Sequence, residues 1–167
     1  LEAPINFVDS NIIGTFNLLE ASKTHWNNLD SDRKYLFKFY HISTDEVFGS
    51  LGQFGYFKED TPYDPRSPYS ATKAASDHLV NAWNKSFNLP TIISNCSNNF
   101  GPRQFPEKLI PLTIFNCLEK KEIRIYGDGQ NIRDWIFVDD HIDAIFLIAN
   151  KGETGSRYCV GGFGEVS

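Results

Sequence analysis

The chain has 167 residues, enough for about one compact domain with a hydrophobic core. Apolar residues make up 41% of it and charged residues 22%, which is the balance of an ordinary globular protein and not of a disordered one. The net charge of −5, without any basic run, argues against nucleic-acid binding, and no stretch of about 18 apolar residues is present to form a membrane span.

The three cysteines, Cys96, Cys117 and Cys159, are far apart in the sequence. No Cys-x-x-Cys pair and no Cys/His cluster with metal-ligand spacing accompanies them. We therefore expect reduced thiols, no bound metal and a cytoplasmic protein. The chain has no initiator methionine and contains no Met at all, so we expect it to be an internal piece of a longer protein.

The first half of the chain alternates between helical and extended patterns. Val8, Ile12, Phe16 and Leu19 recur at helical spacing, which predicts an amphipathic helix over about 5–26. The patterns that follow predict, in order, a strand over 35–43, a long ordered loop over 49–68 and a helix over 67–87.

The second half continues the alternation. Pro111 falls early in a predicted helix over 108–119, where proline is tolerated best, and Asp139 is a good N-cap for a helix over 140–151. The expected extended segments are 91–97, 122–126, 134–138 and 157–160, with a loop over 98–106 and a turn over 127–131. Because strands alternate with helices of this length, the sequence predicts βαβ units and a parallel sheet, in the α/β class.

Tyr69 and Lys73 are four residues apart at the start of the predicted helix over 67–87, so their side chains lie on one face. A nearby ammonium stabilises a phenolate and lowers the pKa of the tyrosine, which makes it a usable base near neutral pH. The spacing alone is weak, because a tyrosine four residues before a lysine occurs by chance in most proteins.

Thr44, Asp45 and Glu46 come directly after the predicted strand over 35–43. In parallel α/β sheets, ligands bind at the carboxyl ends of the strands. Two neighbouring carboxyl groups in a dry pocket push their pKa values apart, so that one can give a proton and the other can accept one. Taken alone, the three residues fit a helix cap or a solvated turn at least as well.

Further polar residues follow the next strand. The segment 95–99, Asn-Cys-Ser-Asn-Asn, offers amide groups for a sugar hydroxyl or a phosphate oxygen, although asparagine is also a common turn residue. Lys108 starts a predicted helix and Arg133 follows a Gly-rich turn, so either cation could neutralise a diphosphate. Each of them alone could equally be an exposed surface cation.

The order of these motifs carries more information than any one of them. Five follow one another: Ser-Thr-Asp-Glu-Val at 43–47, Tyr-x-x-x-Lys at 69–73, Asn-Cys-Ser-Asn-Asn-Phe-Gly-Pro at 95–102, Pro-Glu-Lys-Leu-Ile-Pro at 106–111 and Arg-Asp-Trp-Ile-Phe-Val-Asp-Asp-His at 133–141. In this order the chain resembles the dTDP-glucose 4,6-dehydratases of the extended short-chain dehydrogenase/reductase group over almost its whole length. The whole superfamily shares Tyr-x-x-x-Lys, whereas related epimerases and decarboxylases usually lack the adjacent Asp-Glu pair.

The resemblance implies a Rossmann-like, doubly wound parallel sheet that is incomplete in these 167 residues. The N-terminal Gly-rich βαβ unit, which cradles the NAD pyrophosphate, and the C-terminal part of the substrate domain would lie outside them. Residues of about 1–100 would form the latter part of the NAD-binding domain, and about 101–167 would start the nucleotide-sugar-binding part. The implied reaction of the parent protein is dehydration of dTDP-glucose to dTDP-4-keto-6-deoxyglucose with tightly bound NAD, and the piece alone would be inactive.

The resemblance also implies a role for each motif residue. Tyr69 would take the proton of the sugar 4-hydroxyl, helped by Lys73, which would also bind the nicotinamide ribose, and Thr44 would hydrogen-bond the 4-hydroxyl. Glu46 would take the C5 proton and Asp45 would protonate the departing 6-hydroxyl. Further implied positions are Thr15 and Asn99 near NAD, and Asn98, Lys108, Leu109, Ile125, Tyr126 and Arg133 on the nucleotide sugar.

Several alternatives remain open at this point. The parent protein could be another NAD-dependent nucleotide-sugar enzyme, namely a 4-epimerase, a decarboxylase or a UDP-sugar 4,6-dehydratase, and the sequence does not separate dTDP from UDP. It could also be an inactive fragment with only a binding or structural role. By the same resemblance we expect a homodimer that pairs through a bundle of the helices over 5–26 and 67–87.

Overall fold

The structure is a computed structural model that describes residues 3–51, 55–123, 125, 127, 129, 131–162 and 165–166. The chain divides into two compact units, and each is described here by itself. Unit 1 comprises Leu1–Cys96 and Ile145–Val160, and unit 2 comprises Ser97–Ala144 and Gly161–Ser167. Within the described ranges, no helix combines the length and the apolar character needed to cross a bilayer.

The core of unit 1 is a three-stranded sheet in the order β1-β2-β5, with all strands parallel. Its strands are β1 (Phe39–Thr44), β2 (Thr91–Cys96) and β5 (Arg157–Val160). The register pairs Thr44 with Cys96, and Cys96 with Val160, so the three carboxyl ends lie at one edge. This arrangement confirms the predicted α/β class and places the end of β1 where parallel sheets bind ligands.

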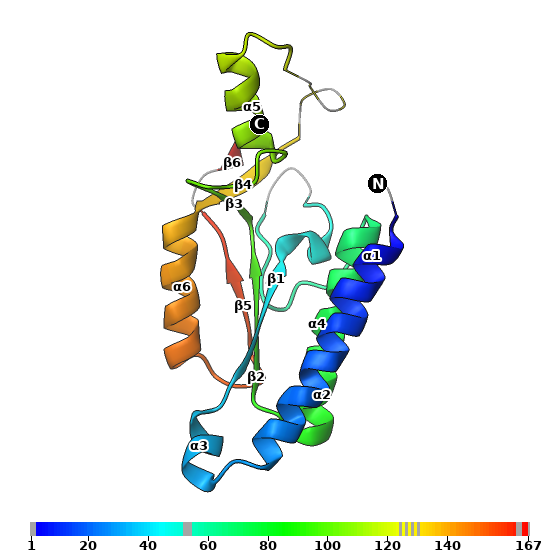
Figure 1. Ribbon diagram of the computed structural model, residues 1–167, viewed down its shortest axis with the longest axis vertical. Coiled ribbons are helices and arrows are strands. Elements are labelled where there is room, and N and C mark those ends of the chain that lie inside the picture. The colour runs from blue at the N-terminus through cyan, green and yellow to red at the C-terminus, as the bar shows by residue number, and fades with distance from the viewer. Residues whose placement is uncertain are drawn as a thin grey trace. The chain divides into compact units, whose positions relative to one another are not determined.

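Two long helices pack beside this sheet (Figure 1). The segments α1 (Ile5–Phe7), η1 (Val8–Ile13) and α2 (Gly14–Asn27) run on from one another, and α4 (Pro68–Phe87) connects β1 to β2. The predicted helix over 5–26 is confirmed, with the difference that η1 is a π-helical turn, a widening often found near functional sites. The side chains of Leu19, Val80, Leu89 and Ile93 form the buried core between helices and sheet.

The start of α4 is fixed by its own sequence. Ser67 and Ser70 form a reciprocal capping box, and Pro68 occupies the first helical turn, where it costs no hydrogen bond. The helix ends at Asn88, which adopts the left-handed conformation of a C-cap. These caps fix where α4 begins and ends, and they therefore place Tyr69 in its first turn.

One predicted strand is partly wrong. The aromatic run over 35–43 is extended only from Phe39, because residues Ser31–Leu36 form the short helix α3. The side chain of Asp30 accepts a hydrogen bond from the backbone N–H of Arg33, and this cap starts the helix. Tyr35 is 87% exposed, so this aromatic residue does not mark a buried strand.

The turn after β1 is a 3-10 helix, η2 (Asp45–Phe48), which ends at Gly49 with a φ of 84°. A Cβ at Gly49 would overlap the carbonyl oxygen of Asp64. We therefore expect Gly49→Ala to destabilise the whole protein by about 1–3 kcal/mol, seen as a lower thermal midpoint. Gly127→Ala is the matched control, because Gly127 also has a positive φ of 62° but nothing lies within 4 Å of its added Cβ. Equal midpoint shifts in the two variants would contradict this steric account.

Unit 2 contains a smaller sheet in the order β3-β4-β6. Its elements are β3 (Asn98–Phe100), α5 (Leu109–Leu118), β4 (Arg133–Phe137), β6 (Glu165–Val166) and the first part of α6 (Val138–Lys151). The predicted loop over 98–106 is wrong in its first three residues, which pair in parallel with β4. The predicted strand over 122–126 is not found, since Glu122, Ile123 and Ile125, the residues described there, lie outside any strand.

Candidate active site

Tyr69 and Lys73 occupy the first two turns of α4 and lie on the face that the spacing predicted. The Tyr69 ring meets Phe7 edge-on, with ring centroids 5.6 Å apart. The ammonium of Lys73 donates a hydrogen bond of 3.0 Å to the backbone carbonyl of Ile42, near the end of β1. Both side chains are half-buried, and the contact with Ile42 places the ammonium of Lys73 near the carboxyl end of β1.

Thr44, Asp45 and Glu46 lie at the same edge. Thr44 is the N-cap of η2, and its hydroxyl accepts the backbone N–H of Glu46 at 3.2 Å and contacts the Asp45 carboxylate at 3.3 Å. The residues therefore do form the cap that the sequence left open as an alternative. The last two residues of η2, Val47 and Phe48, pack against Ala74 of α4, which follows Lys73 directly in the sequence. This packing brings the two motifs together within unit 1.

The electrostatics of Tyr69 correct one expectation. Burial, followed by the Glu46 carboxylate, raises the pKa of Tyr69 above its usual value, and the Asp45 carboxylate acts in the same direction. Burial likewise lowers the pKa of Lys73. The expected lowering of the Tyr69 pKa by Lys73 is therefore wrong for this structure, in which burial and the two carboxylates together raise the pKa of the phenol.

Two asparagines of the segment 95–99, Asn95 and Asn99, make hydrogen bonds within the protein. Asn95 is 1% exposed, and its amide donates to the Thr44 carbonyl at 3.0 Å and to Asp77 at 3.1 Å, so it does not face a ligand. The Asn99 side chain contacts His141 at 2.6 Å and donates to the Ser97 carbonyl at 3.1 Å. The role of Asn99 near NAD stays a prediction, as does that of Thr15, which is buried in the first turn of α2.

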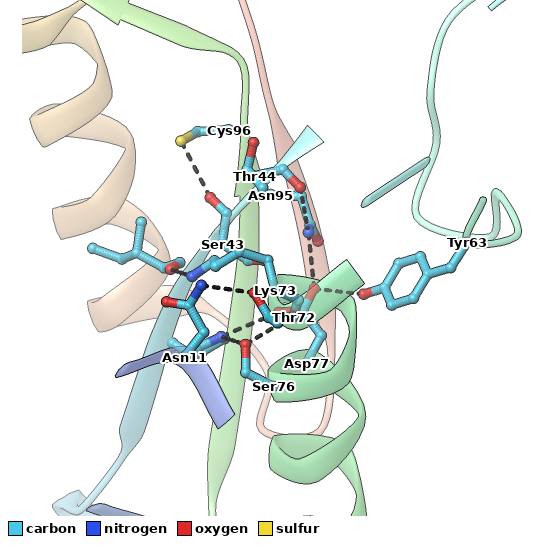
Figure 2. A network of polar contacts seen from close by, with 12 residues as sticks. Asn11, Ser43, Thr44, Tyr63, Thr72, Lys73, Ser76, Asp77, Asn95 and Cys96 are labelled. Atoms are coloured by element: carbon cyan, nitrogen blue, oxygen red, sulfur yellow. Dashed lines mark hydrogen bonds and ion pairs between the residues drawn. The ribbon is translucent and has the colours of Figure 1, made fainter. Parts of the chain in front are cut away.

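Sequence reasoning missed a buried polar network around Asp77, at the level of β1 and β2 (Figure 2). Asp77 is fully buried and contacts Tyr63, His41 and Asn95. The available signal was its spacing, because Tyr69, Lys73 and Asp77 follow one another at four-residue intervals on one face of α4.

Unit 2 holds a cavity of about 470 Å³ that contains two of the predicted substrate residues, Leu109 and Arg133. Its remaining wall is formed by Phe100, Ile110, Thr113, Asn131 and Trp135. Apolar and aromatic walls with one guanidinium at the rim suit a flat base that carries a phosphate. The sequence interpretation did not single out the two aromatic residues or Thr113.

The other predicted substrate residues of unit 2 are more scattered. Lys108 is exposed at the N-cap of α5, and Asn98 is half-buried in β3. Ile125 is 74% exposed, and Tyr126 lies outside the described residues. Among the described residues, Leu109 and Arg133 line one cavity, and the substrate-binding roles of all six residues stay predictions.

The residues around Lys73 fit the ribose of a dinucleotide. An ammonium carries three N–H donors, and the Ile42 carbonyl takes one of them, which leaves donors for a ribose diol at the carboxyl edge of the sheet. No group of three His, Cys, Asp or Glu side chains that could hold a metal ion occurs among the described residues. The phenol of Tyr69, the ammonium of Lys73 and the carboxyl groups after β1 are side chains that can bind hydroxyl groups and transfer protons.

Comparisons with known proteins agree with this geometry. The model of the GDP-mannose 4,6 dehydratase family matches residues 1–167. A probable dTDP-glucose 4,6-dehydratase of Sinorhizobium fredii is 56% identical over 161 residues, and a dTDP-glucose 4,6-dehydratase of Neisseria gonorrhoeae is 55% identical over 160 residues. These matches cover 96% and 95% of this chain but 46% of each relative, so the chain spans about half of their length.

Solved structures show the same fold. The dTDP-glucose 4,6-dehydratase of Bacillus anthracis in complex with NAD superposes with a TM-score of 0.87 at 46% identity, covering 100% of this chain and 51% of that one. A UDP-glucuronic acid 4-epimerase of Bacillus cereus, in complex with UDP-glucuronic acid and NAD, gives 0.83 at 35% identity, covering 96% and 48%. From its parallel Rossmann-like sheet, its motif order and these matches, the chain belongs to the GDP-mannose 4,6 dehydratase family.

Proposed function

We propose that the whole protein is an NAD-dependent nucleotide-sugar 4,6-dehydratase that acts on dTDP-glucose. The observation that carries the proposal is the adjacent Asp45–Glu46 pair, packed beside the helix of Tyr69 and Lys73 at the carboxyl edge of one parallel sheet. The names of the relatives that are 56% and 55% identical to this chain over the aligned residues support the same reaction.

The first half of the reaction is oxidation at sugar C4. Tyr69 takes the proton of the 4-hydroxyl while Thr44 holds that hydroxyl by a hydrogen bond. When bound, NAD would supply the hydride acceptor for C4 and the hydride donor for C6. Lys73 binds the nicotinamide ribose through the ammonium donors that its bond to the Ile42 carbonyl leaves.

The second half is loss of water, and it explains why two carboxyl groups are needed. The new 4-keto group acidifies the C5 proton, which Glu46 takes. Asp45 gives a proton to the 6-hydroxyl, so that it leaves as water. When the hydride arrives at C6, Glu46 returns the proton to C5. The sugar has then lost one molecule of water in total, and its oxidation state is redistributed between C4 and C6.

The direct test is incubation of the whole protein with dTDP-glucose, followed by mass spectrometry of the sugar nucleotide. The proposal expects a product that has lost one water and carries a C4 ketone. A product of unchanged mass, with the C4 configuration inverted and the 6-hydroxyl retained, would instead establish a 4-epimerase, the activity of one structural neighbour. Parallel incubation with UDP-glucose separates the two nucleotides.

Arg133 provides a prediction for the nucleotide part of the substrate. Its guanidinium lies at the cavity of unit 2, where we propose that it pairs with the diphosphate. We expect Arg133→Ala to weaken dTDP binding by about 10- to 100-fold, the usual loss for one hydrogen-bonded charge, measured by calorimetry. The control is Lys121→Ala, which removes an exposed cation that pairs with Glu119 in the same unit. If both variants lose the same factor in dTDP affinity, Arg133 contributes only through the overall charge of the unit.

We also propose that the whole protein is a cytoplasmic homodimer that pairs through the helices of unit 1. Ile13 and Leu18, on η1 and α2, are 49% and 61% exposed, which suits a face covered by a second subunit. Sedimentation of the whole protein tests this proposal, and a monomer at micromolar concentration would contradict it.

A further inference from the structure

Asp77 is the centre of a polar network that the proposed chemistry does not use. Its side chain is 0% exposed on the inner face of α4. The Tyr63 hydroxyl donates to one carboxylate oxygen at 2.6 Å, the Asn95 amide donates to the same oxygen at 3.1 Å, and the His41 ring nitrogen lies 3.1 Å from the other. Figure 2 shows Asp77 between the phenol of Tyr63 and the amide of Asn95.

The charge state of this group follows from its surroundings. Burial alone would raise the pKa of Asp77, but hydrogen bonds from His41 and Tyr63 outweigh burial, so the pKa lies below its usual value. Burial and the neighbouring carboxylate raise the pKa of Tyr63, which keeps its phenol protonated as a donor. At neutral pH the centre of the network is therefore a carboxylate that only accepts hydrogen bonds.

The network leads from α4 to the turn that carries the two proposed catalytic carboxyl groups. The Asn95 amide has two N–H groups, and it donates to Asp77 and to the backbone carbonyl of Thr44. Thr44 in turn caps η2 by accepting the N–H of Glu46. A chain of hydrogen bonds thus joins the helix of Tyr69 to the backbone just before Asp45.

The same network holds η2 from its other side. Tyr63 belongs to the segment that follows η2, and its ring packs 5.5 Å from the ring of Phe48, the last residue of η2. The backbone N–H of Asp64 donates to the Val47 carbonyl at 3.0 Å. The guanidinium of Arg157, from β5, lies 4.4 Å from the centre of the Tyr63 ring. The turn is therefore fixed both by Asn95 and by the segment that Asp77 anchors through Tyr63.

A fully buried carboxylate is an expensive way to stabilise a fold, because well-packed apolar side chains do as well or better. A buried polar network instead favours one arrangement of the elements that its hydrogen bonds join. Proton transfer at a sugar carbon requires such accuracy, since a shift of about 1 Å in a reacting group can cost about 10²-fold in rate.

We propose that Asp77 and Asn95 are positioning residues that hold the Thr44–Glu46 turn against the helix of Tyr69, and that they serve water loss at C5 and C6 more than oxidation at C4. The inference rests on the proposed function. The hydrogen bonds of Asn95 reach the backbone of Thr44, directly before the two carboxyl groups. Thr44 also holds the 4-hydroxyl, so oxidation should slow as well, but by less, because its base, Tyr69, and Lys73 remain fixed by α4 itself.

The test compares two substrates in the whole protein with NAD. Turnover of dTDP-glucose needs oxidation and water loss, whereas dTDP-6-deoxyglucose lacks the leaving hydroxyl and reports oxidation alone, as loss of two hydrogens in a single turnover. We expect Asp77→Asn and Asn95→Ala to slow water loss by about 10- to 100-fold and to slow oxidation of the 6-deoxy sugar by less than about 3-fold. Asn84→Ala is the matched control, because its amide also donates to a backbone carbonyl, that of Leu89, at 2.9 Å. Equal slowing of both substrates, or no slowing, would overturn the inference.

A second readout does not depend on activity. Hydrogen exchange of the backbone amides of residues 45–48 in the whole protein should be about 10-fold faster in Asn95→Ala than in the unchanged protein, and unaltered in Asn84→Ala. Unchanged exchange in Asn95→Ala would show that Asn95 does not hold the turn. If the unchanged protein dehydrates no nucleotide sugar, the proposed function fails, and the exchange result still decides whether these residues position η2.

Discussion

Tyr69→Phe is expected to reduce turnover of dTDP-glucose by the whole protein by about 10²- to 10⁴-fold, the usual contribution of a positioned acid–base group. The variant keeps the ring and its edge-on contact with Phe7 but loses the hydroxyl that would take the 4-hydroxyl proton. Oxidation of dTDP-6-deoxyglucose should fall by the same factor, because both substrates require this first proton transfer. Mass spectrometry of the two sugar nucleotides measures both losses.

The pH dependence of oxidation provides an independent check on Tyr69. Burial and the Glu46 carboxylate raise the pKa of Tyr69, so the phenolate fraction is small at neutral pH and grows as the pH rises. Oxidation by the unchanged protein should therefore speed up with rising pH, whereas Tyr69→Phe should lose this dependence. Tyr158→Phe is the control, because that phenol is in the same unit and accepts the backbone N–H of Glu153 at 2.8 Å. A Tyr69→Phe variant that retains the rise with pH would show that another group is the base.

The parallel sheet and its two long helices could be predicted because their signals are local and strong. Helical periodicity marked the segment over 5–26, and the residues from Ser67 combine a capping box, a proline and a long apolar stripe. The short elements could not be predicted in the same way. The three-residue strand β3 contains too few residues to show alternation, and α3 depends on one capping side chain, that of Asp30, within an aromatic sequence.

The same difference between local and long-range signals applies to the residues of the candidate site. The candidates Thr44, Asp45, Glu46, Tyr69 and Lys73 could be selected from the sequence because they occur in short motifs at an expected strand end and helix start. The fold packs the turn after β1 against α4, which carries Tyr69 and Lys73, and their catalytic roles stay predictions. The network of Asp77 joins residues from β1, β2, α4 and the segment before α4, which are distant in sequence. No local pattern reports such contacts. The direction of the Tyr69 pKa shift was missed for the same reason, because it depends on burial and on Glu46, 23 positions away (69 − 46).

Glu46→Gln is expected to separate the two halves of the reaction. The amide keeps the size of the side chain but cannot take the C5 proton, so loss of water from dTDP-glucose should fall by about 10²-fold or more. Oxidation of dTDP-6-deoxyglucose should persist within about 3-fold, since Tyr69 and Lys73 are unchanged. The substitution also removes the charge that, after burial, most raises the pKa of Tyr69. The pKa of Tyr69 should then fall, and the rise of oxidation with pH should move to lower pH.

The matched control for Glu46→Gln is Glu59→Gln. The Glu59 side chain is exposed in the same unit and accepts the backbone N–H of Cys159 at 3.0 Å, a contact that an amide oxygen preserves. Glu59→Gln should leave the rates with both substrates and the pH profile of oxidation unchanged. Because Tyr69→Phe slows both substrates and Glu46→Gln slows only the one that must lose water, the two variants together assign the phenol to C4 and the carboxylate to C5. Parallel loss of both reactions in Glu46→Gln would instead mean that the carboxylate supports the phenol, and the division of labour proposed for this edge of the sheet would be wrong.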